Sequence, residues 1–146
     1  MIAVDTNILV YAHRRDSRWH DRARDAVAGL AERNRSWAIP WPCVHEFLAI
    51  ATHPRIYDPP STPDEALRQL DAWLESPRLE LLAECDGYHA VLRSVVTAAA
   101  VQGPRVHDAR IAALCQAHGV SVLWTADRDF SRFARLRTAN PLTSDA

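Results

Sequence analysis

Short apolar runs at opposite ends of the chain constrain the fold more than any other feature. Residues 2–4 and 120–124 are almost continuously apolar and rich in β-branched side chains, which is typical of strands covered on both faces by helices. Two further runs of strand length, 37–39 and 79–83, lie between them, and helical patterns separate the four runs. Strands that alternate with helices predict an α/β fold with a parallel sheet.

The expected helices are recognised by apolar residues at three- and four-residue spacing. Pro42 and Pro63 occupy the favoured first helical position, and Ser61 or Thr62 can cap the helix that begins at Pro63. A helix is expected to begin near Asn7, and further helices are expected, in order, at residues 19–33, 42–53, 63–75, 86–101, 106–118 and, as a short turn, 127–133. In such a fold, ligands bind outside the carboxyl ends of the strands, at a topological switch point.

Length and composition set limits on the class of protein. A chain of 146 residues predicts a single domain over 1–146 with its own core. Cys43, Cys85 and Cys115 lie far apart with no CxxC pair, so neither a zinc site nor a disulfide framework is indicated, and a reducing cytoplasm is expected. No apolar run approaches the ~18 residues that a transmembrane helix needs, so no membrane contact is expected.

Four acidic residues stand out against this pattern. Asp5 follows the first strand and Asp127 follows the last, while Glu46 borders the apolar stripe of helix 42–53 and Asp108 lies on the apolar face of helix 106–118. Each acid also has a purely structural explanation. The three aspartates can cap helices, and a glutamate can pack its stem while its carboxylate reaches water.

A parallel sheet can bring all four carboxylates to one edge, where they repel. Two carboxylates about 5 Å apart repel by roughly 3 kcal/mol at an effective dielectric constant near 20. A hard divalent cation such as Mg²⁺ or Mn²⁺ would relieve this repulsion, because it prefers carboxylate oxygens and water. Thr6, Asn7 and Thr125 offer neutral groups that could orient the acids, and a metal with open water positions suits attack on a phosphodiester.

The segments around these acids resemble a known family. "VDTNILVY", "HEFL", "VHDARIAAL" and "TADRDFSRF" occur in the order found in the PIN-domain family, and they look most like the VapC-type ribonuclease toxins of toxin–antitoxin operons. The resemblance implies a three-layer α/β/α fold around a mostly parallel sheet of four to five strands. It also implies an endoribonuclease that uses Mg²⁺ or Mn²⁺ to hydrolyse RNA.

Carried over position by position, the resemblance implies roles for eight residues. The catalytic, metal-binding set would be Asp5, Glu46, Asp108 and Asp127. The supporting residues would be Thr6, Asn7 and Thr125, with Asp129 as an accessory acid. The resemblance further implies a homodimer and a VapB-type antitoxin that crosses the site and points a basic side chain toward the acids.

Other interpretations are weaker or remain open. His45 and Glu46 begin an H-E-x-x-H pattern, but Ala49 stands where the second histidine is needed, so a zinc protease is not indicated. All 17 basic side chains are arginine, which excludes the lysine-dependent phosphoacceptor domains. His107 and the arginine-rich, Trp-containing stretch 13–24 are candidate RNA contacts. A non-catalytic PIN-like interaction module and a structure-specific DNA nuclease of related fold remain alternative functions.

Overall fold

The fold is built on one sheet of five parallel strands. The computed structural model describes residues 1–143, so the last three residues of the expected 1–146 domain lie outside the described part. The strands are β1 (Ile2–Val4), β2 (Trp37–Pro40), β3 (Leu79–Leu82), β4 (Val122–Trp124) and β5 (Thr138–Ala139), in the order β3-β2-β1-β4-β5. Every neighbouring pair is parallel. The predicted parallel sheet of four to five strands is confirmed.

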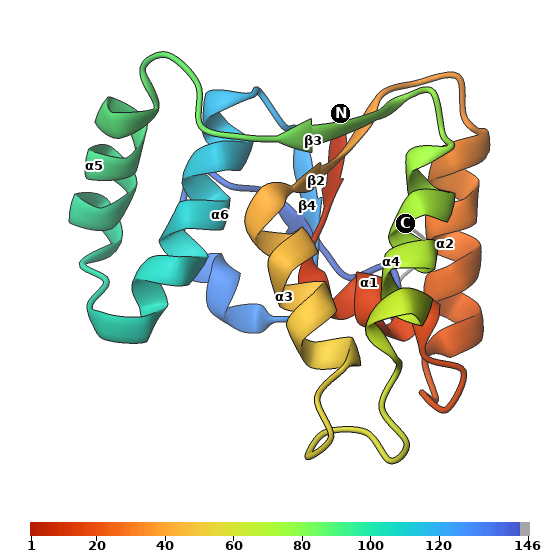
Figure 1. Ribbon diagram of the computed structural model, residues 1–146. Coiled ribbons are helices and arrows are strands. Elements are labelled where there is room, and N and C mark those ends of the chain that lie inside the picture. The colour runs from red at the N-terminus through yellow and green to blue at the C-terminus, as the bar shows by residue number, and fades with distance from the viewer. Residues whose placement is uncertain (144–146) are drawn as a thin grey trace.

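Helices cover both faces of this sheet. They are α1 (Thr6–His13), α2 (His20–Glu32), α3 (Trp41–Ala51), α4 (Pro63–Leu74), α5 (Tyr88–Ala99) and α6 (Val106–Ala117), with 3-10 helices η1 (Gly103–Arg105) and η2 (Arg128–Arg132). In Figure 1, α5 and α6 lie on one side of the sheet and α2 and α4 on the other, which gives the predicted three layers. None of the helices within residues 1–143 is long and apolar enough to cross a membrane.

The strand order creates a switch point between β1 and β4. The chain moves outward from β1 through β2 to β3 and then returns to pair β4 on the free side of β1. Val4 is in register with Trp124, and the Asp5 amide donates to the Trp124 carbonyl oxygen at 2.9 Å. The segments that follow β1 and β4 therefore leave the sheet side by side, where ligands bind in folds of this kind.

β2 and β3 lie within one residue of the sequence-based expectation, whereas β4 and β5 differ from it more. β4 begins at Val122 rather than at residue 120, because the Val120 amide donates to the Cys115 carbonyl oxygen at 2.9 Å and closes the end of α6. Gly119 makes this turn at a φ of 68°, a conformation that favours glycine. β5 contains only Thr138–Ala139, so no apolar run of strand length indicates it in the sequence.

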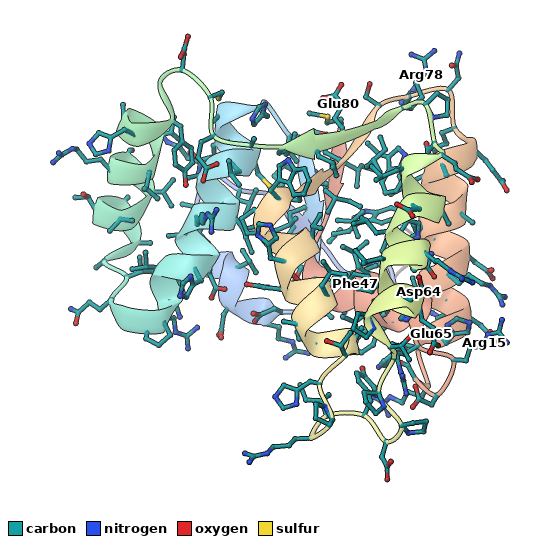
Figure 2. All side chains as sticks on the ribbon, viewed as in Figure 1. Arg15, Phe47, Asp64, Glu65, Arg78 and Glu80 are labelled. Atoms are coloured by element: carbon teal, nitrogen blue, oxygen red, sulfur yellow. The ribbon has the colours of Figure 1, made fainter. Side chains whose placement is uncertain are left out.

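Phe47 anchors α3 to its neighbours (Figure 2). Its side chain is fully buried, and its ring meets Trp73 of α4 edge-on at 5.1 Å and His13 of α1 at 5.4 Å between centroids. Such aromatic pairs add to the free energy gained from burial alone. Because Glu46 precedes Phe47, this packing fixes the side of α3 on which the Glu46 carboxylate lies.

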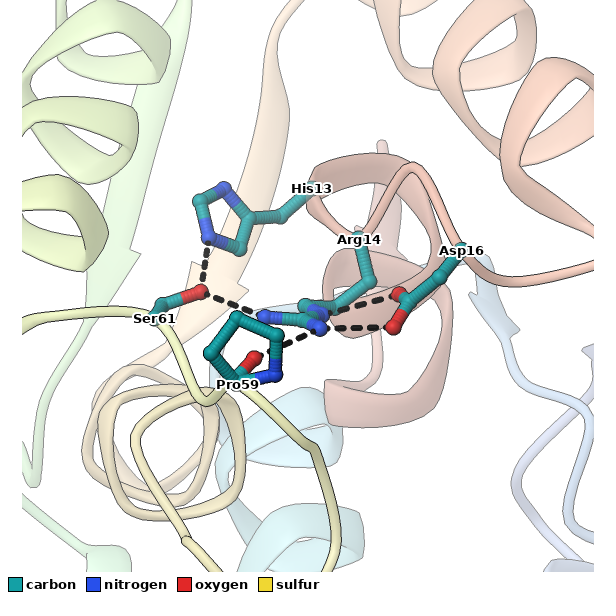
Figure 3. A network of polar contacts seen from close by, with 5 residues as sticks. All are labelled: His13, Arg14, Asp16, Pro59 and Ser61. Atoms are coloured by element: carbon teal, nitrogen blue, oxygen red, sulfur yellow. Dashed lines mark hydrogen bonds and ion pairs between the residues drawn. The ribbon is translucent and has the colours of Figure 1, made fainter.

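Part of the basic stretch 13–24 has a structural role, shown in Figure 3. Arg14 pairs with Asp16 at 2.6 Å and donates to the Pro59 carbonyl oxygen at 3.1 Å and to Ser61 Oγ at 3.2 Å. Nε2 of His13 lies 2.9 Å from the same Ser61 hydroxyl. These contacts tie the end of α1 to the loop before α4, so Arg14 is committed to the fold.

Ser61 and Thr62 have separate roles, which settles which of them caps α4. Thr62 Oγ1 accepts from the Glu65 amide at 3.1 Å, and the Glu65 carboxylate accepts from the Thr62 amide at 3.3 Å. This reciprocal pair is a capping box. Of the two expected caps, Ser61 and Thr62, Thr62 is therefore the one that caps α4.

Candidate acidic site

The four predicted acids lie on segments that meet at the carboxyl edge of the sheet. Asp5 directly follows β1, and Asp127 follows β4. Glu46 is on α3, which begins directly after β2, and Asp108 is in the first turn of α6. The charge of Glu46 raises the pKa of Asp5, and the charges of Glu46 and Asp127 raise the pKa of Asp108. Electrostatic repulsion therefore connects all four carboxylates.

Asp5 is both a helix cap and a buried acid. One of its oxygens accepts from the Thr6 amide at 2.8 Å and the other accepts from Thr125 Oγ1 at 2.7 Å. Its exposed fraction is only 4%. Burial raises the pKa of Asp5 to about 6, and the nearby charge of Glu46 acts in the same direction, although hydrogen bonds from Thr125, Thr6 and the Cys43 thiol oppose them. Its carboxylate is therefore costly to ionise in this site.

Thr6 connects the first two acids. Its backbone amide donates to Asp5, while its hydroxyl donates to Glu46 Oε2 at 2.8 Å. Thr6 is itself buried, and Glu46 is half-buried. One residue at the start of α1 thus fixes an oxygen of each carboxylate.

Thr125 and Asn7 connect the first acid to the last. The Thr125 hydroxyl donates to Asp5 and accepts from the Asp127 amide at 3.0 Å. Asn7 accepts from the Ala126 amide at 3.1 Å and approaches Asp5 with its side-chain nitrogen at 3.5 Å. The three supporting residues named from the sequence therefore touch the acids or the backbone that carries them.

Asp127 and Asp129 have different environments. Asp127 caps η2 by accepting from the Asp129 amide at 2.9 Å, so it is a helix cap as well as one of the four acids of the candidate site. Asp129 instead forms an ion pair with Arg105, with 2.6 Å between Oδ2 and Nη1. The hydrogen bond from Arg105, together with its charge, lowers the pKa of Asp129. The expected accessory acid is thus engaged by an arginine in this structure.

Asp108 is the acid that its surroundings do not explain. α6 begins at Val106, so Asp108 is not its cap. The side chain is half-buried, and within residues 1–143 it makes no hydrogen bond or ion pair. Burial raises the pKa of Asp108, and the charges of Asp127 and Glu46 raise it further, while the charge of Arg105 opposes them. An acid placed this way costs free energy unless something else binds it.

The donor chemistry of the site fits a hard cation, although the acidic side chains stand apart from one another. Across residues 1–143, no three His, Cys, Asp or Glu side chains are close enough to hold a metal ion as they stand. All four acids nevertheless supply carboxylate oxygens, which suit Mg²⁺ or Mn²⁺, and Asp108 has both oxygens available. Binding an ion would require side-chain movement toward it.

Two contacts of the site were not foreseen from the sequence. Arg105 pairs with Asp129, and the Cys43 thiol lies 3.6 Å from Asp5 Oδ1. The position of Arg105, three residues before Asp108, was the one available signal, since that spacing places both groups near the start of α6. His107, the candidate substrate contact, is exposed beside Asp108.

The fold and the site together define a class of protein. It is the class of three-layer α/β proteins that place several acidic side chains outside the carboxyl ends of parallel strands, at the switch point of the sheet.

Comparison with known proteins identifies the family within this class. The PIN-domain model matches residues 2–136, and the chain belongs to the PIN-domain family. It is 32% identical over 142 residues to ribonuclease VapC43 of Mycobacterium tuberculosis, covering 97% of this chain and 96% of the relative. It is 30% identical over 139 residues to ribonuclease VapC48 of the same species, covering 95% and 96%. A solved structure of VapBC2 from Rickettsia felis, bound to a DNA fragment from its promoter, matches with a TM-score of 0.64 and 25% identity over 96% of this chain and 98% of that one.

Proposed function

We propose that this protein is an endoribonuclease toxin that hydrolyses RNA phosphodiester bonds at the acidic site. The observation that carries the proposal is the half-buried, unpaired Asp108 beside the charges of Glu46 and Asp127. The ribonuclease relatives, which span nearly the whole chain, support the same activity. The complete set of acids argues against a non-catalytic interaction module.

Asp5, Glu46, Asp108 and Asp127 are proposed to hold one or two Mg²⁺ or Mn²⁺ ions. When bound, such an ion lowers the pKa of its water and stabilises charge on the scissile phosphate. Thr6 and Thr125 hold oxygens of Asp5 and Glu46 in place through the contacts at 2.7–2.8 Å. Asp108 has no competing protein partner among residues 1–143, so its oxygens are available to orient a water or to bind the ion.

A VapB-type antitoxin is the proposed partner, and the cytoplasm the proposed place of action. The Rickettsia felis relative was solved as a VapBC complex, which supports an antitoxin that neutralises this chain. A homodimer is proposed from the family alone, and light scattering of the purified protein measures it. Two of the three cysteines are buried and all three are free, which agrees with a reducing compartment.

The activity is tested by incubating the purified protein with RNA, with DNA of matching sequence and with branched or flapped DNA. We expect cleavage of single-stranded or folded RNA when Mn²⁺ or Mg²⁺ is present, and none after EDTA is added. Preferential cleavage of branched or flapped DNA would favour the structure-specific DNA nuclease. Intact RNA under all metal conditions, with the acids unchanged, would favour the interaction module.

Replacing Thr125 by valine is expected to weaken Mn²⁺ binding roughly 10- to 100-fold, the usual cost of losing a residue that orients a metal ligand. The valine removes the donor to Asp5 and the acceptor for the Asp127 amide. Calorimetric titration with Mn²⁺ measures the effect. Thr125→Ser keeps the hydroxyl and serves as the control, so equal affinity of the two variants would contradict the orienting role.

A further inference from the structure

Arg105 is the cation that the structure places among the candidate acids. It ends η1 and precedes α6. Besides its 2.6 Å ion pair with Asp129, it experiences the charges of Asp108 and Asp127. Of the ion pairs formed within residues 1–143, this is the one that includes an acid predicted for the site.

The Arg105 guanidinium retains donors for another partner. A guanidinium carries five N–H groups in a planar fork, and it binds phosphate through two of them at once. The contact with Asp129 is made through Nη1, and the Arg105 side chain is 42% exposed. An arginine that is held by one carboxylate and open to solvent beside an RNA-cleaving site is suited to receive a phosphate.

We infer that Arg105 binds a phosphate of the RNA next to the scissile bond and that Asp129 positions it when RNA is absent. This inference rests on the proposed ribonuclease function and extends it to a substrate-binding residue. Asp129 acts through Arg105, as its positioning residue. Asp129 is accordingly not needed as a metal ligand, so its role differs from the one proposed for Asp127.

A purely structural role for the pair makes different predictions. In that case the ion pair serves only to join η1 to η2. An exposed ion pair contributes little to the free energy of unfolding, and removing either partner would have the same small effect. A phosphate contact instead predicts that the arginine matters for RNA binding and that the aspartate matters less.

The chain offers a matched control on the adjoining helix α6. Arg110 pairs with Glu84 at 3.2 Å, and their exposed fractions of 40% and 49% nearly equal the 42% and 50% of Arg105 and Asp129. Glu84 is not one of the candidate acids. Arg110→Ala therefore removes the same charge and the same kind of exposed ion pair without touching the Arg105 contact.

The first measurement is RNA binding in EDTA, where hydrolysis is suppressed. Fluorescence anisotropy with a labelled single-stranded oligoribonucleotide, repeated over a range of salt concentrations, gives Kd and its salt dependence. We expect Arg105→Ala to weaken binding about 5- to 10-fold and to reduce the slope of log K against log salt by about 0.7, the value for one phosphate contact on a single strand. Arg105→Lys should lie in between, because it keeps the charge and loses the fork.

Asp129→Asn and the kinetic constants complete the test. Asp129→Asn should bind RNA as tightly as the unmodified protein or up to about threefold more tightly, since it frees Arg105. In Mn²⁺, Arg105→Ala should raise KM by a larger factor than it lowers kcat, while Arg110→Ala changes neither. Melting temperatures of all variants should agree within about 2 °C, as expected for exposed ion pairs.

Two results would overturn the inference. One is an Arg105→Ala protein with the Kd, salt slope and KM of Arg110→Ala. The other is an Asp129→Asn protein that loses RNA binding to the same extent as Arg105→Ala. If the unmodified protein cleaves RNA in either case, only the assignment of Arg105 fails. If the unmodified protein neither binds nor cleaves RNA, the proposed function itself fails.

Discussion

Replacing Asp5 by asparagine is expected to lower RNA cleavage in Mn²⁺ at least about 100-fold, the upper end of what losing an orienting residue alone costs. The same change should leave the metal-free protein as stable as before or make it more stable. Asparagine caps helices as well as aspartate does, so the contact with the Thr6 amide can be kept. The substitution removes a buried negative charge beside Glu46. The pKa of Asp5, raised to about 6, shows that this charge costs free energy.

The two readouts are initial cleavage rates and urea unfolding in EDTA at pH 7.5. Asp64→Asn is a suitable control, because Asp64 is an exposed acid in the first turn of α4 that pairs with Arg68 at 2.9 Å. It should retain full cleavage and lose at most about 0.5 kcal/mol of stability. A clear drop in the stability of Asp5→Asn would mean that the carboxylate matters mainly as a cap and partner of Thr125.

Between pH 4 and pH 7, the free energy of unfolding of the metal-free protein is expected to fall by about 3 kcal/mol on account of Asp5. The folded-state pKa of about 6 lies above the ordinary value of 3.8, so the folded state holds a proton that the unfolded chain has already released. Raising the pH removes that proton and its stabilisation, at about 1.4 kcal/mol per pH unit between the two pKa values. The raised pKa of Asp108 acts in the same direction.

Urea unfolding in EDTA at several pH values, for the unmodified protein and Asp5→Asn, isolates this contribution as the difference between two curves. The difference between the two curves should grow as the pH rises and become constant above about pH 7. Added Mn²⁺ should reverse the trend for the unmodified protein, because metal ligation requires deprotonated carboxylates. Parallel curves would show that the Asp5 proton is not linked to folding.

The sequence predicted the fold where local signals were strong. Residues 2–4 and 120–124 lack the alternation of a half-exposed strand, and they became the adjacent strands β1 and β4 at the centre of the sheet. Pro63 and Thr62 marked the start of α4 correctly. β5 could not be predicted, because two residues without an apolar pattern are held only by backbone pairing with β4.

The site, too, was predictable only where local sequence signals were strong. The positions of Asp5 and Asp127 after strands placed them at the switch point, and the apolar face around Asp108 separated it from a simple cap. Sequence reasoning treated a capping role and a place in the site as competing explanations, whereas Asp5 and Asp127 each cap a helix at the carboxyl edge of the sheet. The pairing of Arg105 with Asp129 joins η1 to η2 across the intervening α6 and β4, and the spacing of Arg105 from Asp108 indicates only that Arg105 lies near the start of α6.

Translation of this chain has a built-in order of assembly. β1, which precedes Asp5, is made well before its hydrogen-bonded neighbour β4 and the Thr125 hydroxyl, which come 120 positions later. A nascent polypeptide therefore cannot complete the acidic edge until β4 and Thr125 have emerged from the ribosome. If the finished protein cuts RNA, a copy that ends before β4 lacks Thr125 and Asp127, and we expect it to leave RNA intact.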